Sequence, residues 1–147
     1  AQRLAGLDVK YVLSEFALTG PGFVPVQDFG AEHLYLNQAW AGRAWVEGQS
    51  PNTAAVTAWS PNRVEARASG PGRLVLSEVN YPGWQVRVDG LPAVLETANG
   101  ALRAVTLPAG VHTVTFEFRP LAVYAGLTVS LLGLCALVLV LWTWRRA

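Results

Sequence analysis

Apolar and polar residues alternate along short stretches in the second half of the chain, and turn-forming dipeptides separate these stretches. From Trp84 to Val88 every second side chain is apolar, as in a strand with one buried face. Over residues 112–118 one face carries His112, Val114, Phe116 and Phe118, and the other face is polar. Asp89-Gly90 and Asn99-Gly100 favour hairpin turns, because glycine tolerates a positive φ. The pattern predicts an antiparallel meander with strands at residues 73–79, 84–88, 92–97, 101–107 and 111–119.

The first half of the chain is less regular. Strands are predicted at residues 9–13, 23–27, 32–36, 43–46, 52–59 and 63–69, with breaks at residues 60–62 and 70–72. We therefore predict a mainly β fold with an antiparallel β-sandwich-like domain. In it, residues 1–72 form an N-terminal β-rich segment, and residues 73–119 form the meander that completes the sandwich.

The last part of the chain is an apolar run without a charged residue between Pro120 and Trp144. As a helix, residues 121–142 would extend about 33 Å, which matches a hydrocarbon core of roughly 30 Å. A core helix of this length usually carries a polar face, so we predict a transmembrane helix at residues 120–144 instead. Two basic residues, Arg145 and Arg146, follow this run, whereas only Arg119 lies directly before it. Because basic residues prefer the cytoplasmic side, residues 145–147 are expected to be a cytoplasmic tail and residues 1–119 to be extracytoplasmic.

Small residues recur along one face of this predicted helix, namely Ala122, Gly126, Ser130 and Gly133. Such stripes allow a second helix to approach closely, although glycine is also common in membrane helices for other reasons. We expect this face to pack against other transmembrane helices.

Composition narrows the functional classes. Hydrophobic residues make up 52% of the chain and charged residues 14%, against about 25% charged in an ordinary soluble domain. The net charge of +1, with no basic cluster apart from Arg145-Arg146, gives no reason to expect a nucleic-acid partner. Cys135 has no cysteine partner, and His33 and His112 are isolated, so we expect no disulfide, metal site or cofactor. The chain contains no methionine and begins at Ala1, and we interpret it as part of a longer protein.

Several segments in fixed order resemble the carboxyl-terminal region of the YfhO-like bacterial membrane proteins. They are residues 77–84 (SEVNYPGW), 88–90 (VDG), 103–105 (RAV), 107–112 (LPAGVH) and Phe116, followed by Arg119-Pro120 and the apolar run. Residues 8–12 (DVKYV), Leu36-Asn37 and Arg43-Ala44 resemble the preceding part of that family, so the likeness covers nearly the whole chain. Residues 37–40 (NQAW) depart from it, since the family usually has prolines there.

The resemblance implies a polytopic cell-envelope protein of the GT-C glycosyltransferase type, which takes sugars from polyprenyl-phosphate donors on the outer face of the bacterial cell membrane. Its catalytic carboxylate is expected in an early outer loop that this chain does not include. This chain would then be a non-catalytic accessory domain with the last transmembrane helix. The alternative from another class is a membrane-anchored, non-catalytic β-sandwich that binds a glycan or another envelope protein.

Tyr81, Trp84 and Asp89 are the candidate substrate-binding residues, because aromatic rings stack on sugars and a carboxylate can bind two hydroxyl groups. Each has a structural alternative: Trp84 opens a strand, where a large ring often seals a core, and Asp89 precedes a turn glycine. The sequence has no catalytic motif, and nothing in it pairs Glu78 with Glu117 as acid and base.

Overall fold

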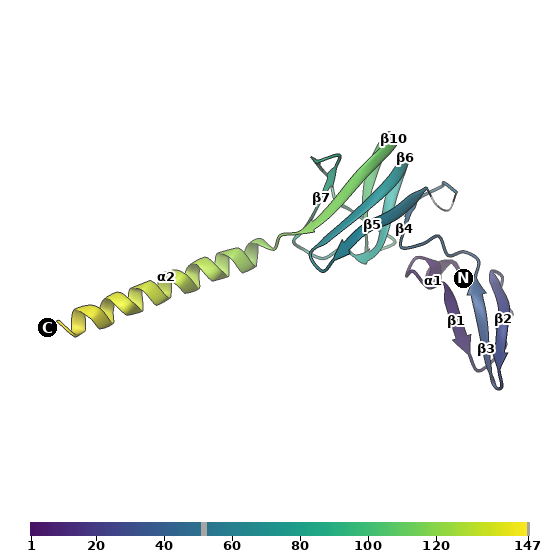
Figure 1. Cartoon of the computed structure of the whole chain (residues 1–147), viewed down its shortest axis with the longest axis horizontal. Helices are drawn as coiled ribbons and strands as arrows, with labels where there is room; N and C mark the ends of the chain where they lie inside the picture. Colours follow the sequence, from purple (N-terminus) through teal and green to yellow (C-terminus); the bar gives the residue numbers. More distant parts are fainter. Residues whose placement is uncertain (51–52, 147) are drawn as a thin grey trace.

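The computed structural model describes residues 1–50 and 53–146. Figure 1 shows three parts: a small three-stranded sheet near the N-terminus, a larger seven-stranded sheet, and one long helix that ends the chain. Pairing in both sheets is antiparallel. The prediction of a mainly β, sandwich-like domain followed by one apolar helix is confirmed.

The three-stranded sheet has the order β1-β3-β2, with β1 at Tyr11–Ser14, β2 at Phe23–Phe29 and β3 at Glu32–Asn37. A short helix, α1 (Gln2–Ala5), precedes it. The buried Asn37 donates from its side-chain amide to the carbonyls of Ala1 (3.1 Å) and Val9 (2.9 Å). This polar residue therefore ties the start of the chain to the end of β3.

The seven-stranded sheet is built around two long strands, β6 (Arg63–Val79) and β10 (Leu102–Phe118), which pair along most of their length. The edge of β6 that faces away from β10 pairs with β5 and β4. The edge of β10 that faces away from β6 pairs with β7 and β9, and β8 pairs with β7. The bounds of the shorter strands are Ala44–Val46 for β4, Ala54–Ser60 for β5, Trp84–Val88 for β7, Leu91–Ala93 for β8 and Glu96–Ala98 for β9.

The long strands differ from the prediction, which breaks each of them at its Gly-Pro-rich segment. In the structure residues 70–72 of β6 lie opposite residues 107–110 of β10, and the register shifts there without ending either strand. A Cβ on Gly70 would collide with the Pro108 carbonyl oxygen, so only glycine allows this close approach. The segments act as a shared bend, and β6 runs without interruption through residue 72. The predicted strand at residues 52–59 begins on a residue outside the described ones; β5 starts at Ala54.

The bend folds the sheet into two layers that enclose the core. Val64, Ala66 and Phe116 come from one side of the bend, Leu74 and Val105 from the other, and all belong to one buried cluster. Long strands that bend from one layer into the next are a known way to close a β-sandwich corner. The predicted strand at residues 92–97 is split for the same reason. β8 pairs with β7 in the layer that contains the end of β10, whereas β9 pairs with the start of β10 in the other layer.

A packed joint connects the sandwich to the final helix, α2 (Leu121–Trp144), which begins three residues after Phe118. The Arg119 amide donates to the Gly83 carbonyl at 2.7 Å. The Trp84 and Phe118 rings lie 5.4 Å apart. Gly83 has a φ of +108°, and a Cβ there would lie 2.9 Å from Phe118 Cε2. We call the part of the sandwich around this joint, residues 59–63, 81–85 and 117–120, the membrane-proximal end.

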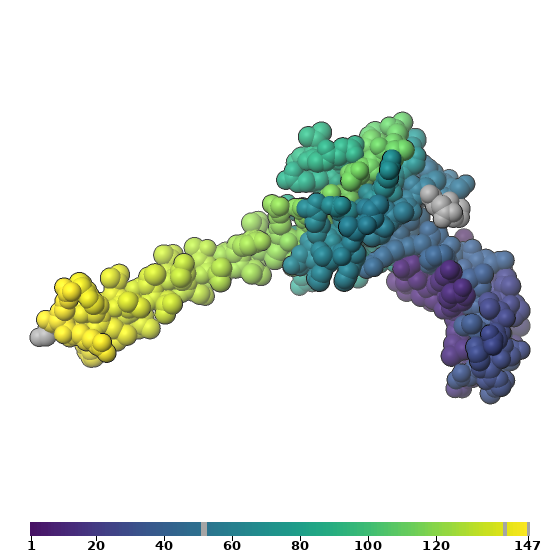
Figure 2. All heavy atoms as spheres, viewed as in Figure 1, coloured from purple at the N-terminus to yellow at the C-terminus, as the bar shows by residue number. Residues whose placement is uncertain are grey.

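Helix α2 extends away from the sandwich as an isolated rod in Figure 2. Among the described residues it is the one helix long and apolar enough to cross a membrane. Its 24 residues give a length of about 36 Å. Of the predicted tail, residues 145 and 146 are described, and residue 147 lies outside the described residues.

Candidate functional site

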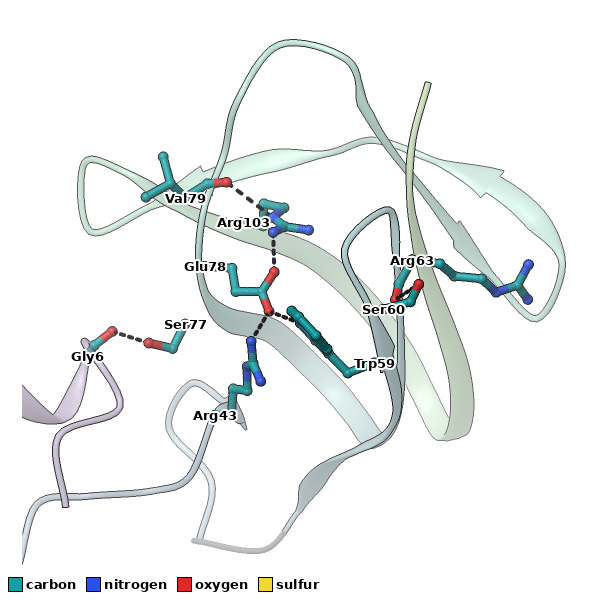
Figure 3. A network of polar contacts seen from close by, with 9 residues as sticks. All are labelled: Gly6, Arg43, Trp59, Ser60, Arg63, Ser77, Glu78, Val79 and Arg103. Carbon is teal, nitrogen blue, oxygen red and sulfur yellow. Dashed lines mark hydrogen bonds and ion pairs between the residues drawn. The ribbon is translucent and has the colours of Figure 1, made fainter. Parts of the chain in front are cut away.

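Glu78 lies at the centre of a polar network that joins four parts of the sandwich (Figure 3). Its Oε1 accepts hydrogen bonds from Arg43 Nη2 at 2.6 Å and from Trp59 Nε1 at 3.0 Å. Its Oε2 accepts from Arg103 Nη2, and Arg103 Nε donates to the Val79 carbonyl at 3.2 Å. One carboxylate thus holds together β5, β6, β10 and the segment that leads into β4.

Strand alternation places these charged side chains inside the sandwich. Glu78 follows the inward-facing Leu74 and Leu76 at a spacing of two, and Arg103 precedes the inward-facing Val105 and Leu107 in the same way. The apolar core therefore gives way to an ion pair towards the membrane-proximal end. Trp59 pairs with Val64, which pairs with Phe116, two residues before β10 ends.

Arg103 is almost completely buried, with 3% of its surface exposed. Its guanidinium lies 3.6 Å from the centre of the Trp84 ring and 5.9 Å from that of Phe116. Burial lowers the pKa of Arg103, while its attraction to Glu78 acts in the opposite direction. Its Nη1 atom is buried and has no hydrogen-bond partner among the described residues. The guanidinium is therefore held by one carboxylate, one carbonyl and an aromatic face.

Trp84, a predicted sugar contact, is half-buried and packs against the core. One face of its ring is already covered by the Arg103 guanidinium, and its neighbour on β10 is Phe118. A shallow groove at the joint is also lined by Trp84, together with Pro82, Gly83 and Arg119. In this arrangement Trp84 supports the buried cation and the joint.

Asp89, a second predicted contact, occupies the turn between β7 and β8 with a φ of +50°. Its carboxylate accepts a hydrogen bond from the Thr113 amide at 2.8 Å and lies 2.7 Å from His112 Nδ1. The bond with His112 lowers the pKa of Asp89, with a further contribution from the Thr113 amide, and the same contact raises the pKa of His112. The pair fastens the β7–β8 turn to β10.

The three predicted contact residues do not converge on one site. Trp84 and Asp89 lie at opposite ends of β7, five positions apart, or about 17 Å along the strand. Tyr81 lies in the turn before β7, and 64% of its surface is exposed. Each of the three thus has a separate environment.

Glu78 and Glu117 are each bound by arginines and do not pair with one another as acid and base. Glu78 is bound by two arginines, and Glu117 lies 2.8 Å from each of Arg63 and Arg119. No cluster of three or more histidine, cysteine or acidic side chains that could hold a metal occurs in residues 1–50 and 53–146. On the helix, a Cβ on Gly126 or Gly133 would meet no atom of the described residues within 4 Å, so no described part of the chain covers the small-residue face.

Sequence reasoning missed the network of Arg43, Trp59, Glu78 and Arg103, and also the Asp89–His112 pair. A signal for the central ion pair is present in the sequence. In both strands a charged residue occupies an inward position of the alternating pattern, Glu78 after Leu76 and Arg103 before Val105. Two opposite charges at inward positions of one sandwich are expected to pair, because a buried charge needs a partner.

These features together define a β-sandwich domain joined by a short packed connection to one helix of membrane-spanning length. A family model described as bacterial membrane protein YfhO matches residues 46–130, more than half of the 147 residues. The chain belongs to this family and is a membrane protein. No curated protein and no solved structure matches it.

Proposed function

We propose that this chain is the accessory carboxyl-terminal domain and last transmembrane helix of a polytopic bacterial membrane protein that transfers sugars from a polyprenyl-phosphate donor. The observation that carries the proposal is the extent of the family match. It begins in β4, crosses the packed joint and continues into α2, so sandwich and helix form one unit of the family. In this role the sandwich stabilises the helix bundle or shapes access of the acceptor.

A non-catalytic role agrees with the chemistry of the described residues. Transfer to an acceptor hydroxyl needs a base and a site for the leaving phosphate. Glu78 and Glu117 are already held by arginines, and Asp89 is held by His112 and a backbone amide. In this proposal the catalytic carboxylate belongs to another part of the larger protein, as the family resemblance implies.

The first test is an activity assay. The chain is reconstituted in liposomes with polyprenyl-phosphate sugars and candidate acceptors, and no turnover above a lipid-only control is expected. Turnover that Glu78→Gln or Asp89→Asn abolishes would contradict the accessory role. The coding sequence upstream gives a second test: many further transmembrane helices with an acidic residue in the first outer loop are expected.

We further propose that the sandwich lies outside the cytoplasm. Arg145 and Arg146 follow α2, and the Arg146 guanidinium lies 3.5 Å from the centre of the Trp142 ring, an arrangement suited to the membrane interface. Alkaline phosphatase fused after Ala147 should be inactive in cells, and green fluorescent protein at the same position should be fluorescent. The reverse pattern would place the sandwich in the cytoplasm.

The open face of α2, with Ala122, Gly126, Ser130 and Gly133, is proposed to pack against neighbouring helices of the same protein. Gly126→Leu and Gly133→Leu should each weaken the association of α2 with the neighbouring helices of the same protein in a membrane-based assay, because a larger side chain keeps the helix backbones apart. Leu127→Ile and Leu134→Ile, outside this face, are matched controls. Equal association of all four variants would remove the stripe from the proposed interface.

The alternative function is a membrane-anchored sandwich that binds a glycan or another envelope protein. The exposed Tyr81 favours it, since an open aromatic face can stack on a sugar ring. Tyr81→Ala should then abolish retention of the chain on envelope polysaccharide while leaving its thermal unfolding unchanged. A signal peptide directly upstream of this chain would also support this alternative.

A further inference from the structure

Two large aromatic side chains are exposed at the membrane-proximal end of the sandwich. Trp59 has 55% and Tyr81 64% of its surface exposed. The Trp59 ring is nevertheless fixed, because its Nε1 donates to Glu78 and the Arg43 guanidinium lies 5.2 Å from the ring centre. The network around Glu78 thus holds an exposed tryptophan in one position.

The joint determines where this end of the sandwich lies relative to a bilayer. Helix α2 is long enough to fill the hydrocarbon core, with Tyr124 in its first turn. Arg119 and Pro120 alone separate β10 from α2, and the bond from Arg119 to Gly83 closes the connection. The polar layer on each side of the core is about 5–7 Å thick. The loops at residues 60–62 and 81–83, which lie beside this connection, are therefore within or directly against the headgroup layer.

We propose that Trp59, Tyr81 and the turn at residues 60–62 form a lipid-contact surface that rests in the headgroup layer of the bilayer crossed by α2. We call these residues the juxtamembrane surface. Trp and Tyr are the side chains that favour the membrane–water interface, since each combines an apolar ring with a polar group. The surface holds the sandwich in one orientation relative to the membrane. The same orientation is expected whether the sandwich lies on the cytoplasmic or on the outer side of the membrane.

The test uses the whole chain in vesicles of phosphatidylcholine and phosphatidylglycerol. Cys135→Ala removes the native cysteine, and single cysteines are introduced by Asn62→Cys or Tyr81→Cys and labelled with an environment-sensitive fluorophore. Asn62 is exposed, and its replacement leaves Trp59 in place. Val111→Cys is the matched control. It is 60% exposed and lies on β10, seven residues or about 23 Å from Phe118.

Phosphatidylcholine with a spin label on its headgroup is the quencher. We expect several-fold stronger quenching at positions 62 and 81 than at position 111, together with a blue-shifted emission. Equal quenching at all three positions would overturn the proposal. A blue shift at 62 and 81 without quenching would also overturn it, because protein rather than lipid would then cover the surface.

Discussion

Replacing Glu78 by glutamine tests whether the network at the membrane-proximal end is a buried ion pair that the fold needs. Glu78→Gln keeps the shape of the side chain but removes the charge that compensates Arg103. Arg103 is 3% exposed and the Glu78 side chain 16% exposed, so water cannot replace the lost partner. Removing one member of a buried pair costs about 3–5 kcal/mol.

The expected effect is set at the lower end of that range, because Arg103 keeps its bond to the Val79 carbonyl and its contact with the Trp84 ring. A loss of about 3 kcal/mol, divided by a guanidinium slope of about 3 kcal/mol per molar, lowers the unfolding midpoint by about 1 M. The assay is guanidinium unfolding of the whole chain in detergent micelles, followed by near-ultraviolet circular dichroism.

Two further variants make this experiment decisive. Glu47→Gln breaks the more exposed Glu47–Arg73 pair in the same sheet and should change the midpoint little, since exposed ion pairs contribute little. Glu78→Gln combined with Arg103→Met should be more stable than Glu78→Gln alone, because no buried uncompensated cation remains; the side chain of Arg43, the other arginine bound to Glu78, is 40% exposed and is hydrated. If Glu78→Gln unfolds at the same midpoint as Glu47→Gln, Arg103 is not a buried charge that depends on Glu78.

Two other predictions follow from the joint and from the Asp89–His112 pair. Gly83→Ala should destabilise the chain by about 1–3 kcal/mol in the same unfolding assay, because the added Cβ meets Phe118. Gly90→Ala, which also has a positive φ but open space around it, should cost less, and equal costs would show that the joint is loosely packed. The pKa of His112 is raised from 6.5, so its contribution to stability is complete below about pH 6.5 and is lost as pH rises through the folded value. The pKa of Asp89 is lowered from 3.8, so its contribution is present above about pH 3.8 and is lost as pH falls through the folded value. Stability of the parent relative to Asp89→Asn should therefore be greatest between these limits, and a difference that does not change with pH would contradict the pairing.

Local patterns in the sequence predicted much of the fold. The alternation over residues 84–88 and 112–118 appears as β7 and the end of β10, and the apolar run appears as α2. These elements could be recognised because each depends on the period of its own side chains. The Gly-Pro-rich segments could not be interpreted correctly in this way. Residues 70–72 and 107–110 form a bend because they face each other, and that pairing depends on a contact between distant parts of the chain.

The candidate site was harder to predict, for a related reason. Tyr81, Trp84 and Asp89 are residue types that suit sugar binding, but the sequence pattern around each one indicates only the segment in which it lies. Trp84 is covered by Arg103, which lies on another strand, and Asp89 is bound by His112 from β10. The partner of each side chain is thus set by register between β7 and β10 and by the bend, and single-strand patterns contain neither.

The position of the ion pair suggests why charged residues close this end of the sandwich. Apolar residues at positions 78 and 103 would extend the core of Phe116 and Leu76 outwards until it met the exposed Trp59. Such an apolar end, lying beside the apolar surface of α2, would insert into the hydrocarbon core together with the loops around it. A carboxylate and two guanidinium groups resist that transfer, because moving a charge into hydrocarbon is expensive. The aromatic rings then favour the headgroup layer while the network behind them prevents deeper insertion, so the two features together fix how far the sandwich stands from the membrane.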